Sequence, residues 1–362
     1  MASPQDGGTR TVLLARFAMV LAVLGLVAVL APLPQPSDRE LLESIGRHPY
    51  APNCADVHCF RAVVPWIMEQ IPGDALVKWR VYAVLFNAGA AFAVGWLSPI
   101  LGLSSKAVPA AVWLSALGAG GLATIYHPYT ADPVMFLLGP LAVGLLLRDR
   151  IRLVGVIAGA GIFVKEFAAA PLWIFTLYAW LARDRARWRS FGAALAVTLL
   201  WLTLQLVLIL GYHNSYADNP STHLFAGGAL RPWFESLGAR KAAAAVIGAF
   251  GPLYLLMAAA LPTAPRQVRL LALAALPAVL AFVYVETPER ALWNFSFLVI
   301  SIAARMLTEL PRPLMWLFVA AYGLANARIG AEIMIVPASR YALLVSGIVA
   351  LPIVLGVWKA RS

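Results

Sequence analysis

The segment RDRIRLVGVIAGAGIFVKEFAAAPLWIFTLYAWLARDRARWR, residues 148–189, decides how this chain folds. Two apolar runs lie between two arginine-rich ends, and Lys165-Glu166 separates the runs. A hydrocarbon core of about 30 Å needs about 20 apolar residues per helix, so each run is short for a crossing. The segment therefore forms either one bent helix or two short helices. The first alternative places the arginine-rich ends on opposite sides of a membrane, and the second places them on the same side.

The composition of the whole chain places it in a membrane. Of its 362 residues, 61% are hydrophobic and only 12% are charged, whereas a soluble domain has about a quarter charged residues. In lipid, such apolar sequence satisfies its backbone groups as helices. We predict an all-α polytopic transmembrane bundle, one integral-membrane domain over 1–362. About twelve spans are expected: 12–32, 80–102, 107–126, 132–147, 152–165, 167–182, 191–211, 241–261, 268–285, 291–309, 313–330 and 340–358.

The charge distribution decides between the two alternatives for 148–189. With the N-terminus in the cytoplasm and twelve spans in order, the inner side holds 16 of the 28 basic residues and 4 of the 17 acidic residues. Lys and Arg concentrated in short inner loops are what the positive-inside rule expects. A single helix over 152–182 would scatter this pattern. We therefore predict two helices there and cytoplasmic termini, and the net charge of +11 needs no nucleic-acid partner.

The outer side carries the longest connections, from about 33 to 79 and from about 212 to 240. Residues 36–46 (PSDRELLESIG) predict a short helix with Ser37 as its N-cap. Residues 57–71 place Val57, Phe60, Val64 and Ile67 or Met68 on one helical face. This spacing predicts an amphipathic helix on the membrane surface. Because the inner loops are too short for a nucleotide-binding fold, we expect any chemistry on the outer side or inside the bundle.

Lys165 and Glu166 are the most informative polar residues. A charge at membrane depth costs about 2.5–3.5 kcal/mol on insertion scales, so such residues usually face a cavity or a partner. The simpler interpretation is that they end two helices at the outer surface. One polar residue would suffice for that turn, which favours a functional role.

Polar residues in other outer segments are further candidates. His127 and Asp132 flank one outer turn, although an acid that opens a helix is also a plain dipole preference. Glu286 and Arg290 lie in another outer turn, and Arg61 lies in the predicted surface helix. Arginines can hold a phosphate with their fork of donors. The alternative for both is snorkelling to the membrane interface.

The first outer loop supplies acids and both cysteines. Asp38 and Asp56 are the acids best placed to act as general base towards an acceptor, although a solvated loop acid is the ordinary state of a single aspartate. Cys54 and Cys59 are the only cysteines, and an oxidising compartment favours a disulfide between them over two free thiols. With His58 they could also be zinc ligands, but no fourth ligand has a recognised spacing, so we predict no metal site.

Four short segments carry a resemblance to a known family. They are HCFRAVVPWI (58–67), TADP (130–133), VKEF (164–167) and ETPER (286–290). Together with a first helix followed by a long outer loop, they resemble the integral-membrane glycosyltransferases of the GT-C superfamily, including uncharacterised bacterial members. The resemblance covers roughly the first 300 residues. Where many members have an Asp-Glu pair, this chain has Asp38-Arg39.

The resemblance implies a reaction and roles for the candidate residues. It implies transfer of a sugar from a polyprenyl-phosphate donor, a membrane lipid, to an unknown acceptor on the periplasmic face of a bacterial inner membrane. Asp38 or Asp56 would activate the acceptor, and Arg61, Lys165 and Arg290 would hold the lipid phosphate. The donor or acceptor pocket would contain His58, His127, Asp132, Glu166 and Glu286. No nucleotide or other cofactor is expected, and a need for a divalent cation stays open.

Two other functions remain open from the sequence. One is a transporter or flippase of a lipid-linked or small anionic solute, although the second half shows no counterpart of VKEF that would indicate an inverted repeat. The other is a non-catalytic subunit of a membrane complex. A scaffold gains little from charges such as Lys165 and Glu166, which favours the enzyme.

Overall fold

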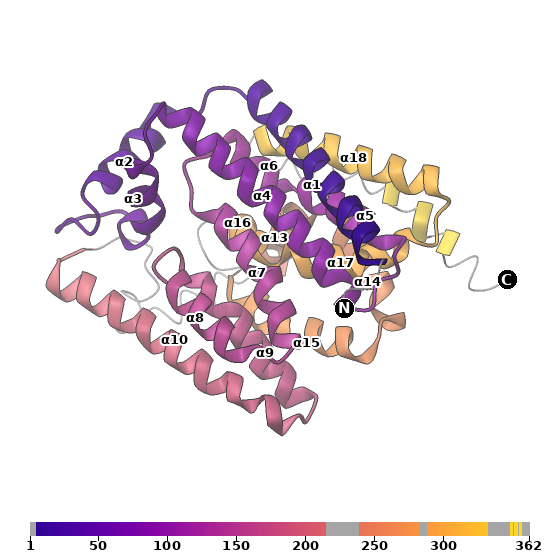
Figure 1. The fold of residues 1–362 in the computed structure, drawn as a ribbon. Coiled ribbons are helices and arrows are strands. Elements are labelled where there is room, and N and C mark those ends of the chain that lie inside the picture. The colour runs from indigo at the N-terminus through magenta and orange to yellow at the C-terminus, as the bar shows by residue number, and fades with distance from the viewer. Residues whose placement is uncertain are drawn as a thin grey trace.

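The computed structural model describes residues 5–214, 239–282 and 288–331, with the short pieces 348–349, 351–353 and 355–356. These residues form helices and turns and no strand, as the composition predicts. The helices pack together as one bundle (Figure 1). In chain order they are α1 (Gln5–Leu30), α2 (Pro36–Arg47), η1 (Val57–Phe60), α3 (Val63–Gln70), α4 (Ala75–Ile100), α5 (Ala107–Ala116), α6 (Ala119–Tyr126), α7 (Asp132–Leu147), α8 (Ile151–Gly161), η2 (Glu166–Ala169), α9 (Ala170–Leu181), η3 (Arg185–Trp188), α10 (Arg189–Leu206), η4 (Val207–Gly211), α13 (Ala239–Phe250), α14 (Leu253–Ala260), η5 (Leu261–Thr263), α15 (Arg266–Phe282), α16 (Pro288–Leu292), η6 (Trp293–Phe295), α17 (Ser296–Leu307) and α18 (Arg312–Ala331).

Each predicted span up to residue 330 overlaps helix in the described residues, although α8 ends at Gly161 and the end of the span 268–285 lies outside them. Four described helical segments are long and apolar enough to cross a membrane: Ala75–Ile100, Ala107–Tyr126, Arg185–Gly211 and Glu289–Leu307. Several further apolar helices are shorter. The count of twelve crossings therefore stays a prediction. The predicted span 340–358 and the predicted loop 212–240 fall mostly outside the described residues.

Several predicted single spans are interrupted. The span 107–126 is two helices, α5 and α6, that meet at Leu117 and Gly118. The span 241–261 is also two helices, with Gly251 between them at φ 53°, a conformation that favours glycine. In the first break the Asn326 side chain donates to the carbonyl of Leu117 (2.9 Å). A polar side chain from another helix thus satisfies a backbone group that the helix leaves free.

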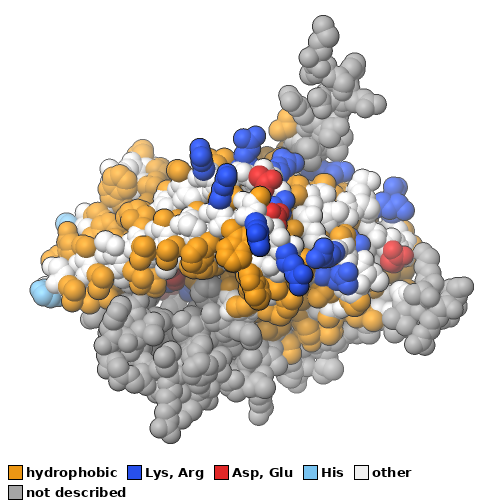
Figure 2. All heavy atoms as spheres, turned by 90° about the horizontal axis from the view of Figure 1, so that it is seen from below, with side chains coloured by type: hydrophobic (Ala, Val, Ile, Leu, Met, Phe, Trp, Pro, Cys, Tyr) orange, Lys and Arg blue, Asp and Glu red, His pale blue; other side chains and the backbone are white. Residues whose placement is uncertain are grey.

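The segment 148–189 forms two helices that reverse direction at Lys165-Glu166. Arg187 Nε lies 3.3 Å from Asp149 Oδ1, which joins the loop before α8 to the loop after α9. One continuous helix would have placed these two residues at opposite ends. At this end Arg305 also donates to the carbonyl of Gly102 (3.2 Å), so further loops predicted to be internal lie together. Figure 2 shows Lys and Arg gathered toward one part of an otherwise largely hydrophobic face.

The loops predicted to lie outside contact one another as well. The backbone N–H of Asn53 donates to the carbonyl of Tyr212 (2.8 Å), and that of Cys54 donates to Asn214 Oδ1 (3.0 Å). The first outer segment is therefore attached to the end of the α10–η4 helix. Together with the inner contacts, this shows that several loops predicted to share one side do contact one another among the described residues. Which end faces the cytoplasm stays a prediction.

The first outer segment differs in detail from its prediction. The N-cap of α2 is Gln35 instead of Ser37, because Pro36 occupies the first helical position, where its missing N–H costs nothing. The predicted helix 57–71 is divided into η1 and α3 at Arg61. Phe60, Val64 and Met68 are buried with Ile45 of α2 against Trp79 of α4. Figure 1 shows α2 and α3 side by side at the start of α4.

The other face of α3 remains available to lipid. Trp66 and Ile67 are exposed there, and Ile71 just beyond the helix is exposed as well. Phe60, Val64 and Met68 therefore lie on one buried face, as predicted, whereas Ile67, the alternative to Met68, does not. The outer loop also ends earlier than predicted, because Asp74 caps α4 by accepting from the backbone N–H of Val77 (3.0 Å).

Small residues allow the helices around the Lys165-Glu166 turn to pack closely. A Cβ on Gly144 of α7 would lie 2.2 Å from the ring of Trp96 on α4. Gly155 and Gly159 face Ala193 and Leu200 of α10. The glycines of α8 therefore serve helix packing, as an apolar helix with no preceding strand predicts. This packing holds α7, α8 and α9 in the positions that bring their outer ends together.

Candidate active site

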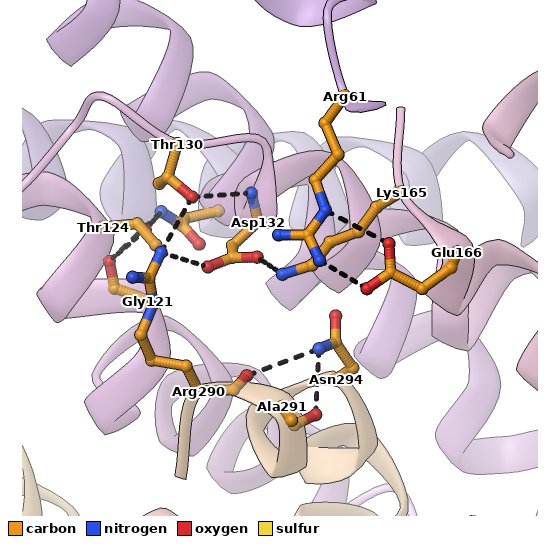
Figure 3. A network of polar contacts seen from close by, with 11 residues as sticks. Arg61, Gly121, Thr124, Thr130, Asp132, Lys165, Glu166, Arg290, Ala291 and Asn294 are labelled. Atoms are coloured by element: carbon orange, nitrogen blue, oxygen red, sulfur yellow. Dashed lines mark hydrogen bonds and ion pairs between the residues drawn. The ribbon is translucent and has the colours of Figure 1, made fainter. Parts of the chain in front are cut away.

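Charged side chains from four separate segments meet at the predicted outer end of the bundle. Asp132 is the first residue of α7, Lys165 precedes η2, Glu166 opens η2, and Arg290 belongs to α16. Arg61 reaches them from the turn between η1 and α3. Figure 3 shows the side chains of these five residues, here called the charged network, directed toward one another.

Asp132 is the centre of the charged network. Its side chain is 1% exposed and each carboxylate oxygen accepts from a different cation. Lys165 Nζ donates to Oδ1, and Arg290 Nη2 donates to Oδ2 at 3.1 Å. The Lys165 side chain is itself only 7% exposed, whereas that of Arg290 is 35% exposed. Asp132 therefore does more than complement a helix dipole, because it holds two cations in place.

Arg61 and Glu166 form the second pair of the charged network. Arg61 Nε lies 3.1 Å from Oε2 of Glu166, and its Nη2 lies 2.5 Å from Oε1. Both side chains are partly buried, at 19% and 29% exposed. The two-pronged geometry is the strongest that a guanidinium makes with a carboxylate. The interruption of the helix at Arg61, where φ is −129°, frees this side chain from the α3 surface and lets it reach η2.

Thr130 fixes the geometry around Asp132. Its Oγ1 accepts from the backbone N–H of Asp132 (3.2 Å) and from Arg290 Nη2 (3.3 Å). The TADP segment thus supplies both the carboxylate and the hydroxyl that orient Arg290. Sequence reasoning noted the polar turn but gave Thr130 no role.

The charge balance of the network defines what it can bind. Three cations face two carboxylates, which leaves one positive charge. Since buried charges are stable only when paired and hydrogen-bonded, the arrangement favours an added monoanion over a neutral ligand or a cation. A phosphodiester carries a single negative charge and accepts from both arginine and lysine.

The first-loop acids lie outside the direct contacts of the charged network. Asp38 is exposed in the first turn of α2. Asp56 caps η1, where its Oδ1 accepts from the backbone N–H of His58 and lies 2.7 Å from His58 Nδ1. The hydrogen bond from the His58 side chain is the main cause that lowers the pKa of Asp56, and Arg61 also lowers it. Asp56 is therefore an ionised partner of His58, five residues before Arg61.

The remaining candidates have mixed positions. His127 is half-buried at the C-terminus of α6, where its backbone N–H donates to Ala123. Glu286 lies outside the described residues. Cys54 and Cys59 are joined in a disulfide that encloses Asp56 and His58. Because this bond occupies both sulfurs, the three-donor zinc interpretation does not hold, and the described residues contain no cluster of acidic, His or Cys side chains suited to a metal.

Sequence reasoning also missed a polar residue beside the charged network. Asn294 follows Arg290 by four residues in η6 and is buried. An amide inside the apolar run 291–309 is an unusual position for a polar group, and this was the signal that could have revealed it.

Comparisons with known proteins add little to this geometry. No protein-family model matches the chain, and no curated protein matches its sequence. Among solved structures it is similar to the oligosaccharyltransferase of Archaeoglobus fulgidus tethered with an acceptor peptide containing the NVT sequon via a disulfide bond. The two are 13% identical with a TM-score of 0.43, over 92% of this chain and 55% of that one. The chain thus spans about half the length of that protein, and a likeness this distant identifies neither a family nor an activity.

Proposed function

We propose that this chain is an integral-membrane glycosyltransferase that takes a sugar from a polyprenyl-phosphate donor at the outer face and transfers it to an acceptor. The observation that carries the proposal is the charged network, with one excess positive charge at the predicted outer end of an apolar bundle. The resemblance of TADP, VKEF and ETPER to GT-C enzymes supports it, since these segments supply four of the five charged residues.

In this proposal the charged network binds the donor phosphate. A glycosyl phosphodiester has one negative charge, which matches the excess positive charge of the network. Arg290 and Arg61 are more exposed than Lys165, so they are the cations that an entering phosphate reaches first. Asp132 and Glu166 keep the three cations oriented before the lipid arrives. Preorganised cations at a leaving phosphate stabilise the charge that develops in the transition state.

The reaction exchanges one bond for another. The acceptor oxygen or nitrogen attacks the anomeric carbon of the sugar and forms the new glycosidic bond. The bond from that carbon to the phosphate oxygen breaks, and polyprenyl phosphate leaves with the electron pair. A base takes the acceptor proton. The energy resides in the phosphate-linked sugar, so a nucleotide has no role in this step.

We assign the base to the Asp56–His58 pair in preference to Asp38. Asp132 is unsuited because both of its oxygens already hold cations. Asp56 is ionised and fixed on η1, close enough to Arg61 for that cation to lower its pKa. The hydrogen bond to Asp56 also orients His58, which then offers its other ring nitrogen to the acceptor. Asp38 remains the alternative of the first loop.

The test measures both sugar transfer and lipid transport with one preparation of the protein. The purified protein is reconstituted into vesicles. It is then incubated with a polyprenyl-phosphate sugar whose sugar is radiolabelled and with a membrane extract that supplies the acceptor. We expect transfer by the wild type and by Asp38→Asn, a loss of at least about 100-fold in Asp56→Asn, and no transfer by Lys165→Met. Retained transfer in Asp56→Asn with loss in Asp38→Asn would move the base to Asp38. Movement of the labelled lipid across the vesicle membrane without any transfer product would favour a flippase instead.

A further inference from the structure

Asn294 presents an unpaired acceptor beside the charged network. It lies in η6, the turn where the helical segment Glu289–Leu307 changes its hydrogen-bonding pattern. The residue is 7% exposed. Among the described residues no donor reaches its Oδ1. Buried polar atoms are almost always hydrogen-bonded, so a buried acceptor of this kind indicates a partner that is not part of this chain's described residues.

The orientation of the amide is set by its other end. Asn294 Nδ2 donates to the carbonyl of Ala291 at 2.9 Å and approaches that of Arg290 at 3.4 Å. Only the NH₂ end of an amide can donate, so these carbonyls fix the nitrogen and direct the oxygen away from them. Figure 3 shows the oxygen of Asn294 pointing toward Lys165 and Glu166. The free acceptor therefore faces the charged network and not the backbone of η6.

The missing donor has a restricted chemistry. The cations of the network donate to carboxylates, and none of their N–H groups reaches Asn294 Oδ1. A phosphate has no donor to offer at neutral pH, and a polyprenyl chain has neither donor nor acceptor. Of the parts of a polyprenyl-phosphate sugar, only the sugar carries hydroxyl groups that donate to an amide oxygen.

The spacing along the helix suits such a ligand. Asn294 is one helical turn beyond Arg290, and one turn rises about 5–6 Å. In a glycosyl phosphate the ring is bonded directly to the phosphate oxygen. A phosphate held by Arg290 therefore brings ring hydroxyls within reach of Asn294.

We infer that Asn294 is a specificity residue that accepts a hydrogen bond from one hydroxyl of the donor sugar. The inference rests on the proposed function, because it names the part of the donor that the charged network does not bind. In this arrangement the charged network holds the phosphate of any such lipid, and Asn294 discriminates among the sugars attached to it.

The experiment measures how much the sugar adds to binding. Farnesyl methyl phosphate, a phosphodiester with the same single charge as the donor, and farnesyl phosphates carrying glucose, galactose, mannose or arabinofuranose are titrated into the detergent-solubilised full chain. For the wild type we expect at least one sugar to lower Kd about tenfold below that of farnesyl methyl phosphate, the effect of one well-placed hydrogen bond that would otherwise be unmade. Asn294→Ala should remove this gain and leave the Kd of farnesyl methyl phosphate within about twofold. Asn326→Ala, which removes another buried amide that donates to a carbonyl, should keep the gain.

A second arm needs only the wild type. Analogues of the preferred sugar that each lack one hydroxyl identify the group that donates, and we expect one of them to bind about tenfold more weakly. The inference is overturned if no sugar binds better than farnesyl methyl phosphate, if every deoxy analogue binds as well as its parent, or if Asn294→Ala keeps the full gain. If the wild type does not bind farnesyl methyl phosphate at all, the proposed function is overturned, and this outcome is distinct from failure of the inference.

Discussion

Replacement of Asp132 by asparagine should destabilise the protein more than any other single change in the charged network. Asp132 is 1% exposed and holds two cations, one of which, Lys165, is itself only 7% exposed. Removal of one partner of a buried ion pair costs about 3–5 kcal/mol, because the remaining charge stays buried without compensation. Arg290 is 35% exposed, so it can turn toward water and should add little to this cost.

The same reasoning gives an order for the other variants. Lys165→Met leaves Asp132 with Arg290, and it should cost less than Asp132→Asn. The double variant Asp132→Asn/Lys165→Met removes both buried charges, so it should be more stable than the sum of the single losses predicts by about 1–3 kcal/mol. Asp184→Asn breaks a partly exposed ion pair with Arg187 outside the charged network and serves as the control, with an expected cost below about 1 kcal/mol.

The assay is the temperature at which the detergent-solubilised protein loses its monodisperse peak in size-exclusion chromatography. At about 2 °C per kcal/mol for a chain of this size, Asp132→Asn should lower that temperature by roughly 6–10 °C. The double variant should recover part of this loss. A melting temperature of Asp132→Asn within about 2 °C of the control, or a double variant that shows the full sum of both losses, would refute a buried charge pair at this position.

Three further predictions concern other parts of the fold. Gly144→Ala should lower the melting temperature by an amount that corresponds to about 1–3 kcal/mol, because its Cβ would lie 2.2 Å from Trp96. Gly89→Ala in the same α4–α7 interface is the matched control, since its Cβ would meet Leu137 at an ordinary 3.5 Å; equal losses would contradict the packing. Asp56, with its pKa lowered chiefly by His58 and its side chain 37% exposed, should stabilise the protein by less than about 1 kcal/mol. The difference in stability between the wild type and Asp56→Asn should be constant above the ordinary carboxyl pKa of about 3.9 and should disappear as the pH falls through the lowered pKa of folded Asp56. A stability difference that persists in stronger acid would contradict this assignment. Cys54 and Cys59 should resist a membrane-impermeant maleimide added to intact cells until a reductant is added, and labelling without reductant would argue against the disulfide.

The sequence was sufficient for the features that depend on charge and hydropathy. The arginine-rich ends of 148–189 predicted a reversal at Lys165-Glu166, and the contact between Asp149 and Arg187 places those ends together. The polar outer turns were predicted to share one side, and Asp132, Lys165 and Arg290 do meet. These outcomes follow from the cost of charge in lipid, which acts on composition and needs no knowledge of packing.

Other features depend on tertiary contacts that a single sequence does not encode locally. The pairing of Arg61 with Glu166 joins residues 105 positions apart, and a local helical pattern through 57–71 gave no sign that the helix would be interrupted to allow it. The break at Leu117-Gly118 is stabilised by Asn326 from a distant helix. Asn294 was missed because one amide in an apolar span has no spacing pattern to recognise.

The shortness of α8 and α9 has a consequence for the surrounding lipid. The helical segments Ile151–Gly161 (α8) and Glu166–Leu181 (η2 with α9) have 11 and 16 residues and measure about 17 and 24 Å. Both are shorter than the roughly 30 Å of a bilayer core, whereas the neighbouring segment Arg185–Gly211 has 27 residues. Such a mismatch is relieved when the bilayer thins locally or water enters from one side. Either response lowers the headgroup level next to Lys165 and Glu166. A lipid that diffuses along the leaflet at this end of the bundle would then meet the charged network at the depth of its own phosphate, without leaving the membrane.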